Sequence, residues 1–242
     1  MPDGAEMKNS LQGRVVIISP HLDDAVLSLG SSIAATARGG ATIEVLSVFC
    51  GNPASRATAG TWDRKSGFAS EGDASRTRRE EDRTACTILG ATARWLSFGD
   101  EQYERRGNEQ EVCSAIAAAV DGADVVLIPG WPLTNSDHAW LSEMLLRTRL
   151  RCSRLGLYLE EPYAFYRRES GPVTCTPTLH SMVGAMPSWH HLSVSRLDRQ
   201  LKRKAVRAYR SQARQLGLGF LGVLRLLQYE RARGGEAIAW LS

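Results

Sequence analysis

Short runs of apolar, largely β-branched residues alternate with longer helix-forming segments along most of this chain. The apolar runs have the length and composition of buried strands, which we expect at residues 15–18, 42–50, 93–98, 124–129 and 155–159. Between them lie segments with helical spacing of apolar residues, and we expect helices at residues 25–38, 75–89, 108–120 and 139–154. This alternation predicts an α/β fold with a doubly wound, mostly parallel sheet and helices on both faces.

The last third of the sequence is less regular than the rest. Residues 174–189 show no periodicity, and residues 192–195 have the composition of a short strand. Residues 197–216 are charged and amphipathic, which is typical of a surface helix, and we expect another helix at residues 220–233.

Length, charge and cysteine content limit the classes to which the protein can belong. We expect one domain over residues 13–242 behind a flexible N-terminus of residues 1–12, because a chain of 242 residues can bury a sizeable core in one unit. The formal net charge of +4 is small and its arginines are spread out, so we expect no nucleic-acid partner. The five cysteines are scattered without a Cys-x-x-Cys pair, which favours a reducing compartment. With no signal core and no membrane span in the sequence, we expect a cytoplasmic protein, and a homo-oligomer is compatible with these features.

A histidine and two aspartates follow directly after the first expected strand. His21, Asp23 and Asp24 lie between this strand and the helix at residues 25–38. In an open parallel sheet, ligands bind beyond the carboxyl ends of the strands. Imidazole and carboxylate groups suit a divalent cation such as zinc. The alternative is that the aspartates only cap the helix, which explains one aspartate but not the histidine.

A second polar group, made of Asn135, Asp137 and His138, follows the fourth expected strand. The ends of the first and fourth strands can be neighbours across the crevice of a doubly wound sheet. His138 would then join His21 and Asp24 as the three protein ligands of one zinc ion per chain, with a fourth position open for water. Taken alone, His138 would be an ordinary histidine at the start of a helix.

Several spaced motifs resemble the PIG-L or LmbE-like family of zinc-dependent deacetylases of N-acetylglucosamine conjugates. Residues 20–24 match the family's Pro/Ala-His-x-Asp-Asp motif, and residues 135–138 match the second half of its His-x-x-His motif. Further matches, in the family's order, are Arg78-x-x-Glu81, Asp100, Lys202-x-x-Ala205 and Ser211-Gln212. The resemblance covers roughly residues 14–215.

The resemblance implies a Rossmann-like fold and a zinc ion held by His21, Asp24 and His138. It also implies that Asp23 is the general base on the zinc-bound water, and that the substrate is a small-molecule amino-sugar conjugate that loses its N-acetyl group. The chemistry is consistent, because zinc lowers the pKa of a bound water to about 7. A carboxylate next to a ligand is close enough to take the proton of that water.

The chain departs from the family pattern at Asn135. There the family has the first histidine of His-x-x-His, which acts with the aspartate two residues on, here Asp137, as general acid or oxyanion donor. An asparagine amide donates a hydrogen bond but cannot deliver a proton to a leaving amine. Either Asp23 takes both proton roles, or another histidine enters the site, or activity is weak. The candidates for an additional histidine are His180, His190 and His191.

Three further residues are candidates for substrate contacts. Arg78 belongs to the Arg-x-x-Glu match, and its alternative is an exposed ion pair with Glu81. Glu161 and Tyr163 follow the fifth strand and could reach sugar hydroxyls, whereas the alternative is a proline turn with solvated carboxylates. The segments at residues 51–73 and 164–191 would set the choice of acceptor.

Three functions are therefore compatible with the sequence. The first is a zinc-dependent hydrolase that removes an N-acetyl group from an N-acetylglucosamine-type conjugate. The second is a metal-dependent amidase with another amide substrate. The third is a zinc- or sugar-binding pseudoenzyme that lost turnover because Asn135 replaces the expected histidine.

Overall fold

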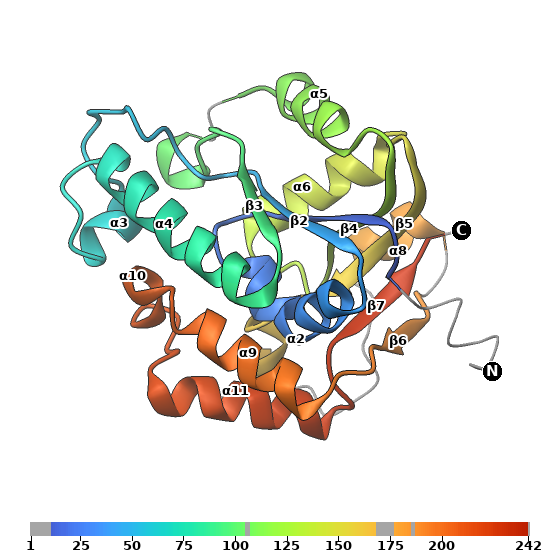
Figure 1. Ribbon diagram of the computed structural model, residues 1–242. Helices are drawn as coiled ribbons and strands as arrows, with labels where there is room; N and C mark the ends of the chain where they lie inside the picture. Colours follow the sequence, from blue (N-terminus) through green and yellow to red (C-terminus); the bar gives the residue numbers. More distant parts are fainter. Residues whose placement is uncertain (1–10, 105–106, 168–176, 185–186, 242) are drawn as a thin grey trace, which may run out of the picture.

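The computed structural model describes residues 11–104, 107–167, 177–184 and 187–241 of the chain. Within these residues one seven-stranded sheet, with the strand order β3-β2-β1-β4-β5-β7-β6, runs through the middle of the molecule (Figure 1). The strands are β1 (Arg14–Ser19), β2 (Thr42–Ser47), β3 (Thr92–Trp95), β4 (Ala123–Trp131), β5 (Cys152–Leu159), β6 (Trp189–His191) and β7 (Ala237–Trp240).

Strands β3, β2, β1, β4 and β5 are parallel to their neighbours. β7 runs antiparallel to β5, and β6 runs antiparallel to β7. The chain proceeds from β1 to β2 and β3 on one side, and later to β4 and β5 on the other side. β1 and β4 therefore flank the switch point of the sheet, where ligands bind in folds of this kind. The predicted α/β class and the mostly parallel sheet are confirmed.

Helices cover both faces of the sheet. They are α2 (Asp24–Arg38), α3 (Thr61–Lys65), α4 (Glu71–Leu89), α5 (Glu109–Val120), α6 (Ser136–Arg147), α7 (Tyr163–Arg167), α8 (Pro177–Val183), α9 (Arg196–Val206), α10 (Arg210–Ala213) and α11 (Phe220–Ala232), with a 3-10 turn η1 (Glu101–Tyr103). Helices α2, α4, α9 and α11 pack on one face, and α5 and α6 on the other (Figure 1).

The alternation of side chains in β1 explains the two layers of core. Val15 and Ile17 pack with α2 and its neighbours, whereas Val16 and Ile18 pack with α5 and α6. All four side chains are fully buried. A strand that is buried on both faces needs apolar residues at every position, which is why the continuous apolar run was readable as a central strand.

Two boundaries between helix and strand differ from the prediction. The helix expected at residues 139–154 begins earlier and ends at Arg147, because Thr148 adopts an extended backbone. Cys152, expected inside that helix, instead begins β5 and pairs with β4. The pairing with β4 overrides the helical pattern of apolar residues in this segment.

The C-terminal part differs more from the prediction. The helix expected at residues 197–216 is divided into α9 and α10, and the strand expected at 192–195 lies earlier, as β6. Helix α8 lies inside the segment expected to be irregular, of which residues 174–176 and 185–186 are outside the described residues. Strand β7 was not predicted, because four residues are too few to show a period.

The sequence also predicts a flexible N-terminus over residues 1–12. Residues 1–10 of the predicted flexible segment lie outside the described residues, whereas Leu11 is buried against the core. The domain boundaries stay a prediction.

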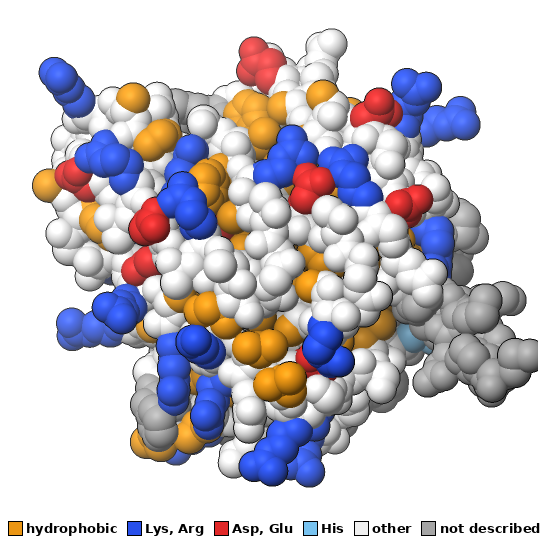
Figure 2. Space-filling view, viewed as in Figure 1, with side chains coloured by type: hydrophobic (Ala, Val, Ile, Leu, Met, Phe, Trp, Pro, Cys, Tyr) orange, Lys and Arg blue, Asp and Glu red, His pale blue; other side chains and the backbone are white. Residues whose placement is uncertain are grey.

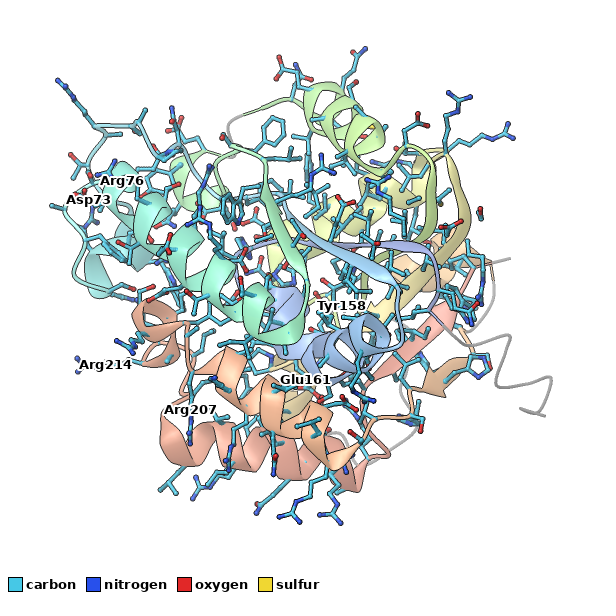
Figure 3. All side chains as sticks on the ribbon, in the orientation of Figure 1. Asp73, Arg76, Tyr158, Glu161, Arg207 and Arg214 are labelled. Carbon is cyan, nitrogen blue, oxygen red and sulfur yellow. The ribbon has the colours of Figure 1, made fainter. Side chains whose placement is uncertain are left out.

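Lys and Arg side chains are scattered over several elements of the visible face (Figure 2), and Arg214 extends outward at the end of α10 (Figure 3). Among the described residues, no helix has the length and apolar character needed to cross a bilayer.

A buried carboxylate connects the elements around the division between α9 and α10. Asp82 of α4 is 1% exposed and accepts hydrogen bonds from the Tyr209 hydroxyl and from the Trp95 indole, both at 2.7 Å. Tyr209 lies between α9 and α10, and Trp95 ends β3. Burial raises the pKa of Asp82 to about 6, although these hydrogen bonds and the charge of Arg83 oppose the shift.

This raised pKa predicts a pH-dependent cost of keeping Asp82 buried. Between about pH 4 and pH 6 the unfolded chain loses this proton before the folded chain does, so the contribution of Asp82 to stability falls as pH rises. The Asp82→Asn substitution retains the shape of the side chain, and the amide can still hydrogen-bond with Tyr209 and Trp95. We expect its free energy of unfolding, relative to wild type, to rise by about 2 kcal/mol between about pH 4 and pH 7. Urea denaturation at the two pH values measures this difference, and a pH-independent difference would contradict the assignment.

Candidate active site

Two strand-end loops meet at the switch point of the sheet. His21, Asp23 and Asp24 follow β1, and Asn135, Asp137 and His138 follow β4. β1 and β4 are adjacent and parallel, so their carboxyl ends lie side by side. The prediction that the ends of the first and fourth strands are neighbours is confirmed.

The sharp turn after β1 is held by Ser19 and Asp24. The Ser19 hydroxyl donates to the backbone oxygen of His21 at 2.6 Å and accepts from the backbone nitrogen of Ala25 at 3.0 Å. Oδ2 of Asp24 accepts from the backbone nitrogen of His21 at 2.8 Å. Asp23 occupies the N-cap position of α2 without a capping hydrogen bond from its side chain. The alternative in which this aspartate serves as a helix cap is therefore wrong.

Three donor atoms from the two loops converge on one point. His21 Nδ1 lies 3.2 Å from Asp24 Oδ2 and 3.2 Å from His138 Nε2, and the distance from His138 Nε2 to Asp24 Oδ2 is 3.1 Å. Ligand atoms about 2.1 Å from a tetrahedral cation lie about 3.4 Å from one another. The donors are two imidazole nitrogens and one carboxylate oxygen. Their spacing and their chemistry therefore fit a single divalent metal ion.

Carboxylates outside this trio orient both imidazoles. His21 Nε2 lies 3.2 Å from Asp137 Oδ2, and this oxygen also accepts from the backbone nitrogen of Glu101 at 3.2 Å. His138 is fully buried, and its Nδ1 is hydrogen-bonded to Glu160 Oε1. Metal-binding histidines characteristically have such a carboxylate on the ring nitrogen that faces away from the ion.

The electrostatics of the site favour a cation. Burial opposes a charged imidazole, but hydrogen bonds to Asp137 and Asp24 raise the pKa of His21 well above its usual value. Burial also opposes the charged form of His138, yet Asp24 and Glu160 raise its pKa to about 9. Burial and the adjacent Asp24 raise the pKa of Asp23 to about 8. Buried carboxylates that attract protons in this way also attract a metal ion.

A cavity of about 400 Å³ is lined by two of the three converging residues, His21 and Asp24, whereas His138 lies buried behind them. Its walls come from both strand-end loops, from α3 and α4, from η1, and from the region of α7 and α10. The lining residues are His21, Leu22, Asp23, Asp24, Phe49, Trp62, Arg78, Asp100, Glu101, Gln102, Asn135, Asp137, Tyr163, Gln212 and Leu216. The cavity size suits a small-molecule ligand.

Arg78 lies at this cavity, as the prediction of a substrate contact requires. Its Nη2 lies 2.6 Å from Asp63 Oδ1, and its guanidinium stacks on the ring of Phe68. The alternative, an ion pair between Arg78 and Glu81, is wrong. Glu81 instead accepts hydrogen bonds from the backbone nitrogen and the hydroxyl of Ser211, at 2.9 and 2.7 Å.

The segment after β5 is arranged differently from both of its predicted forms. Tyr163 lines the cavity, but Glu161 does not and lies near α2 (Figure 3). The Glu161 carboxylate accepts from Arg233 Nη2 at 2.7 Å and from the backbone nitrogen of Phe165 at 3.0 Å. Glu160 and Glu161 are each 1% exposed, so the alternative of solvated carboxylates is also wrong.

Part of the site could not be predicted from the sequence. The contact between Glu160 and His138 joins residues 22 positions apart, and a Glu-Glu pair before a proline carries no signal of it. Leu216 reaches the cavity from the residues after α10, which carried no such signal, whereas Trp62 comes from the segment at 51–73 that was expected to set the choice of acceptor. The additional histidines proposed for the site, His180, His190 and His191, are not among the lining residues.

The role of Glu160 predicts a measurable effect on metal binding. In Glu160→Gln the partner of His138 Nδ1 loses its charge, so we expect the affinity for zinc to fall about 10- to 100-fold with the fold preserved. Isothermal titration calorimetry with Zn²⁺ measures the affinity, and circular dichroism checks the fold. The matched control is Glu161→Gln, which changes the neighbouring buried carboxylate that faces Arg233. Equal affinities in wild type and Glu160→Gln would contradict this role.

Comparisons with known proteins agree with the motifs and the fold. Residues 16–148, more than half of the chain, match the family model described as PIG-L: GlcNAc-PI de-N-acetylase. A comparison with curated proteins found no match.

Three solved structures illustrate the similarity. A deacetylase from the biosynthesis pathway of teicoplanin is 26% identical, with a TM-score of 0.74 over 94% of this chain and 96% of that chain. The zinc-inhibited form of teicoplanin deacetylase Orf2 is 25% identical, with a TM-score of 0.74 over 94% of this chain and 97% of that chain. The N,N'-diacetylchitobiose deacetylase from Pyrococcus horikoshii is 17% identical and shares the fold, with a TM-score of 0.62 over 97% of this chain and 86% of that chain. The chain described here thus belongs to the PIG-L family of N-deacetylases, as its spaced motifs implied.

Proposed function

We propose that this protein is a zinc-dependent hydrolase that removes the N-acetyl group of an N-acetylglucosamine-type conjugate. The observation that carries the proposal is the convergence of His21, Asp24 and His138 beside a cavity that His21, Asp23 and Asp24 line. Membership in a deacetylase family and the similarity to deacetylases of known structure support the same reaction.

Zinc is the metal that the donor set fits best, because two imidazoles and one carboxylate leave a fourth tetrahedral position open. When bound, the ion would supply Lewis acidity and lower the pKa of a water molecule at that open position. Asp137 and Glu160 keep His21 and His138 in the orientation that this binding needs.

Asp23 is the general base of the proposed reaction. It is buried, lies next to the ligand Asp24 in the chain, and is not one of the three converging donors. A bound cation would lower the raised pKa of Asp23 and so keep its carboxyl group ionised. The carboxylate accepts the proton of the attacking water as the water oxygen bonds to the amide carbon. The same proton then passes to the nitrogen as the carbon–nitrogen bond breaks, which yields a free amine and acetic acid, which ionises to acetate. Asp23 thus takes both proton roles, since the ligand His21 has the only imidazole among the described lining residues.

The rest of the cavity would bind the sugar and its aglycone. Arg78 Nε and Asp100 Oδ1 are buried atoms without a hydrogen-bond partner among the described residues, so they are available to sugar hydroxyls. Trp62 is 37% exposed and lies with Leu216 on the cavity wall, where an apolar surface suits a sugar face or an aglycone. Trp62 belongs to the segment at 51–73 that was expected to set the choice of acceptor, whereas Leu216 lies outside the expected segments.

A cytoplasmic location remains part of the proposal. Cys50, Cys86, Cys113 and Cys152 are free cysteines in the described part of the chain, which supports a reducing compartment. The homo-oligomer remains an expectation from the sequence.

The general-base role predicts that Asp23→Asn binds metal and loses the reaction. We expect kcat for acetate release to fall about 10²- to 10⁴-fold, with the zinc content unchanged, because the amide cannot accept the proton. Acetate release from N-acetylglucosamine conjugates measures turnover, and elemental analysis measures zinc. The control Asp73→Asn removes an exposed carboxylate that pairs with Arg76 and should retain full turnover. Normal turnover in Asp23→Asn would show that the base is another group.

Removal of the metal gives a test of the proposed function itself. Chelation should abolish acetate release, and addition of one equivalent of Zn²⁺ should restore it. Bound zinc without turnover of any N-acetyl amino sugar would instead support the pseudoenzyme, for which Asn135 is the motivating observation. Turnover of other amides only would support the broader amidase.

A further inference from the structure

The replacement of a histidine by Asn135 leaves one corner of the cavity without a proton-bearing imidazole. Asn135 Oδ1 accepts from the backbone nitrogen of Asp137 at 2.8 Å and so caps α6. This bond fixes the orientation of the amide and leaves its NH2 group as the available donor. If charge develops on the substrate at this corner, a group other than histidine stabilises it.

Tyr163 stands beside Asn135 and next to the proposed metal site. Its ring packs edge-on against the imidazole of His138, with 5.2 Å between the centroids and an angle of 83° between the planes. It lines the cavity, and among the described lining residues no other carries a hydroxyl group. The Asn135 side chain is close enough to the phenol to affect its electrostatics. The Tyr163 hydroxyl is therefore placed in the same corner as the substituted motif position.

The phenol of Tyr163 is a persistent hydrogen-bond donor. The ordinary pKa of a phenol is about 10, so the Tyr163 hydroxyl keeps its proton at neutral pH. A protonated phenol in a buried site is a strong donor toward an oxygen that gains negative charge.

The structure holds Tyr163 rigidly, through the residues on either side of it. The backbone nitrogen of Ala164 donates to the Glu160 oxygen at 3.1 Å, and the Tyr229 hydroxyl donates to the Ala164 oxygen at 3.2 Å. The Glu161 carboxylate bonds to the backbone of Phe165 and to Arg233, as described above. Glu161 thus fixes helix α7, which presents Tyr163 to the cavity. A donor that is fixed before the reaction stabilises charge without the cost of reorganisation.

We propose that the Tyr163 hydroxyl donates a hydrogen bond to the amide oxygen of the substrate and strengthens it as that oxygen becomes an oxyanion. Tyr163, with Asn135 beside it, thereby takes over the oxyanion part of the role of the missing histidine. The hydroxyl keeps its proton throughout, and the proton from water travels by way of Asp23. This inference rests on the proposed amide hydrolysis, and it assigns Tyr163 to catalysis rather than to binding of sugar hydroxyls alone.

The test is the Tyr163→Phe variant, which removes one oxygen atom and retains the ring that packs against His138. We expect kcat for N-acetyl hydrolysis to fall about 10²- to 10³-fold, the loss measured for single oxyanion donors, with KM within about threefold of wild type. The zinc content should not change. The matched control is Tyr166→Phe on the same helix. The Tyr166 hydroxyl donates to the backbone oxygen of Leu216, and Tyr166 is not a lining residue, so kcat should stay at the wild-type value even if KM changes.

A second substrate tests whether the Tyr163 hydroxyl acts as an oxyanion donor or has only a structural role. Trifluoroacetyl amides stabilise their own oxyanion through the fluorine atoms, so they depend less on the enzyme's donor. The Tyr163→Phe penalty on kcat should therefore be at least about tenfold smaller for an N-trifluoroacetyl substrate than for the N-acetyl one. A structural role would give equal penalties on both substrates, and equal penalties overturn the inference.

The outcomes also distinguish this inference from the proposed function. An active wild type with less than about threefold loss of kcat in Tyr163→Phe overturns the role of Tyr163 and leaves the deacetylase intact. A zinc-loaded wild type inactive on both substrates overturns the proposed function and this inference with it.

Discussion

The contact between the ends of β1 and β4 is the constraint on which the rest of the site depends. It brings His21 and Asp24 within 3.2 Å of His138, although 117 residues separate the two histidines. The pairing of two parallel strands sets this distance, because adjacent parallel strands end at the same edge of the sheet. Ser19 then fixes the turn after β1, and Asn135 fixes the start of α6. The metal-binding geometry is thus a consequence of sheet topology and two local hydrogen-bond patterns.

Residues from the C-terminal part of the chain hold in place the helix that carries Asp24. Lys202 of α9 is fully buried and bonds to Glu230 at 2.6 Å and to Glu236 at 2.8 Å. Glu236 also accepts from the backbone nitrogens of Ser31 and Ser32, just after the kink of α2 at Leu29. Burying charges is costly unless they are paired. Lys202 contacts both carboxylates, and burial raises the pKa of Glu230 to about 8, which favours its neutral form. The network ties α9, α11 and the start of β7 to the helix that carries Asp24.

The sequence was sufficient for the features that depend on local pattern. The five parallel strands could be predicted from their apolar runs, and the ligand trio from polar residues at two strand ends. The predictions that were wrong concern features that depend on tertiary contacts. Tyr209 turns toward Asp82 between α9 and α10, and the antiparallel strands β7 and β6 are short and gain their form from pairing. Glu161 was expected at the cavity, but Arg233, 72 residues away, holds it inside the molecule. No local pattern could reveal such partners.

The most direct test of the account is the position of the metal ion. Crystals of the zinc-loaded protein, measured on both sides of the zinc absorption edge, would show it by anomalous scattering. The account predicts one peak per chain, about 2.0–2.2 Å from His21 Nδ1, Asp24 Oδ2 and His138 Nε2, with Asp23 outside the ligand set. A peak that lacks His138 as a ligand, or no peak between these two loops, would contradict it.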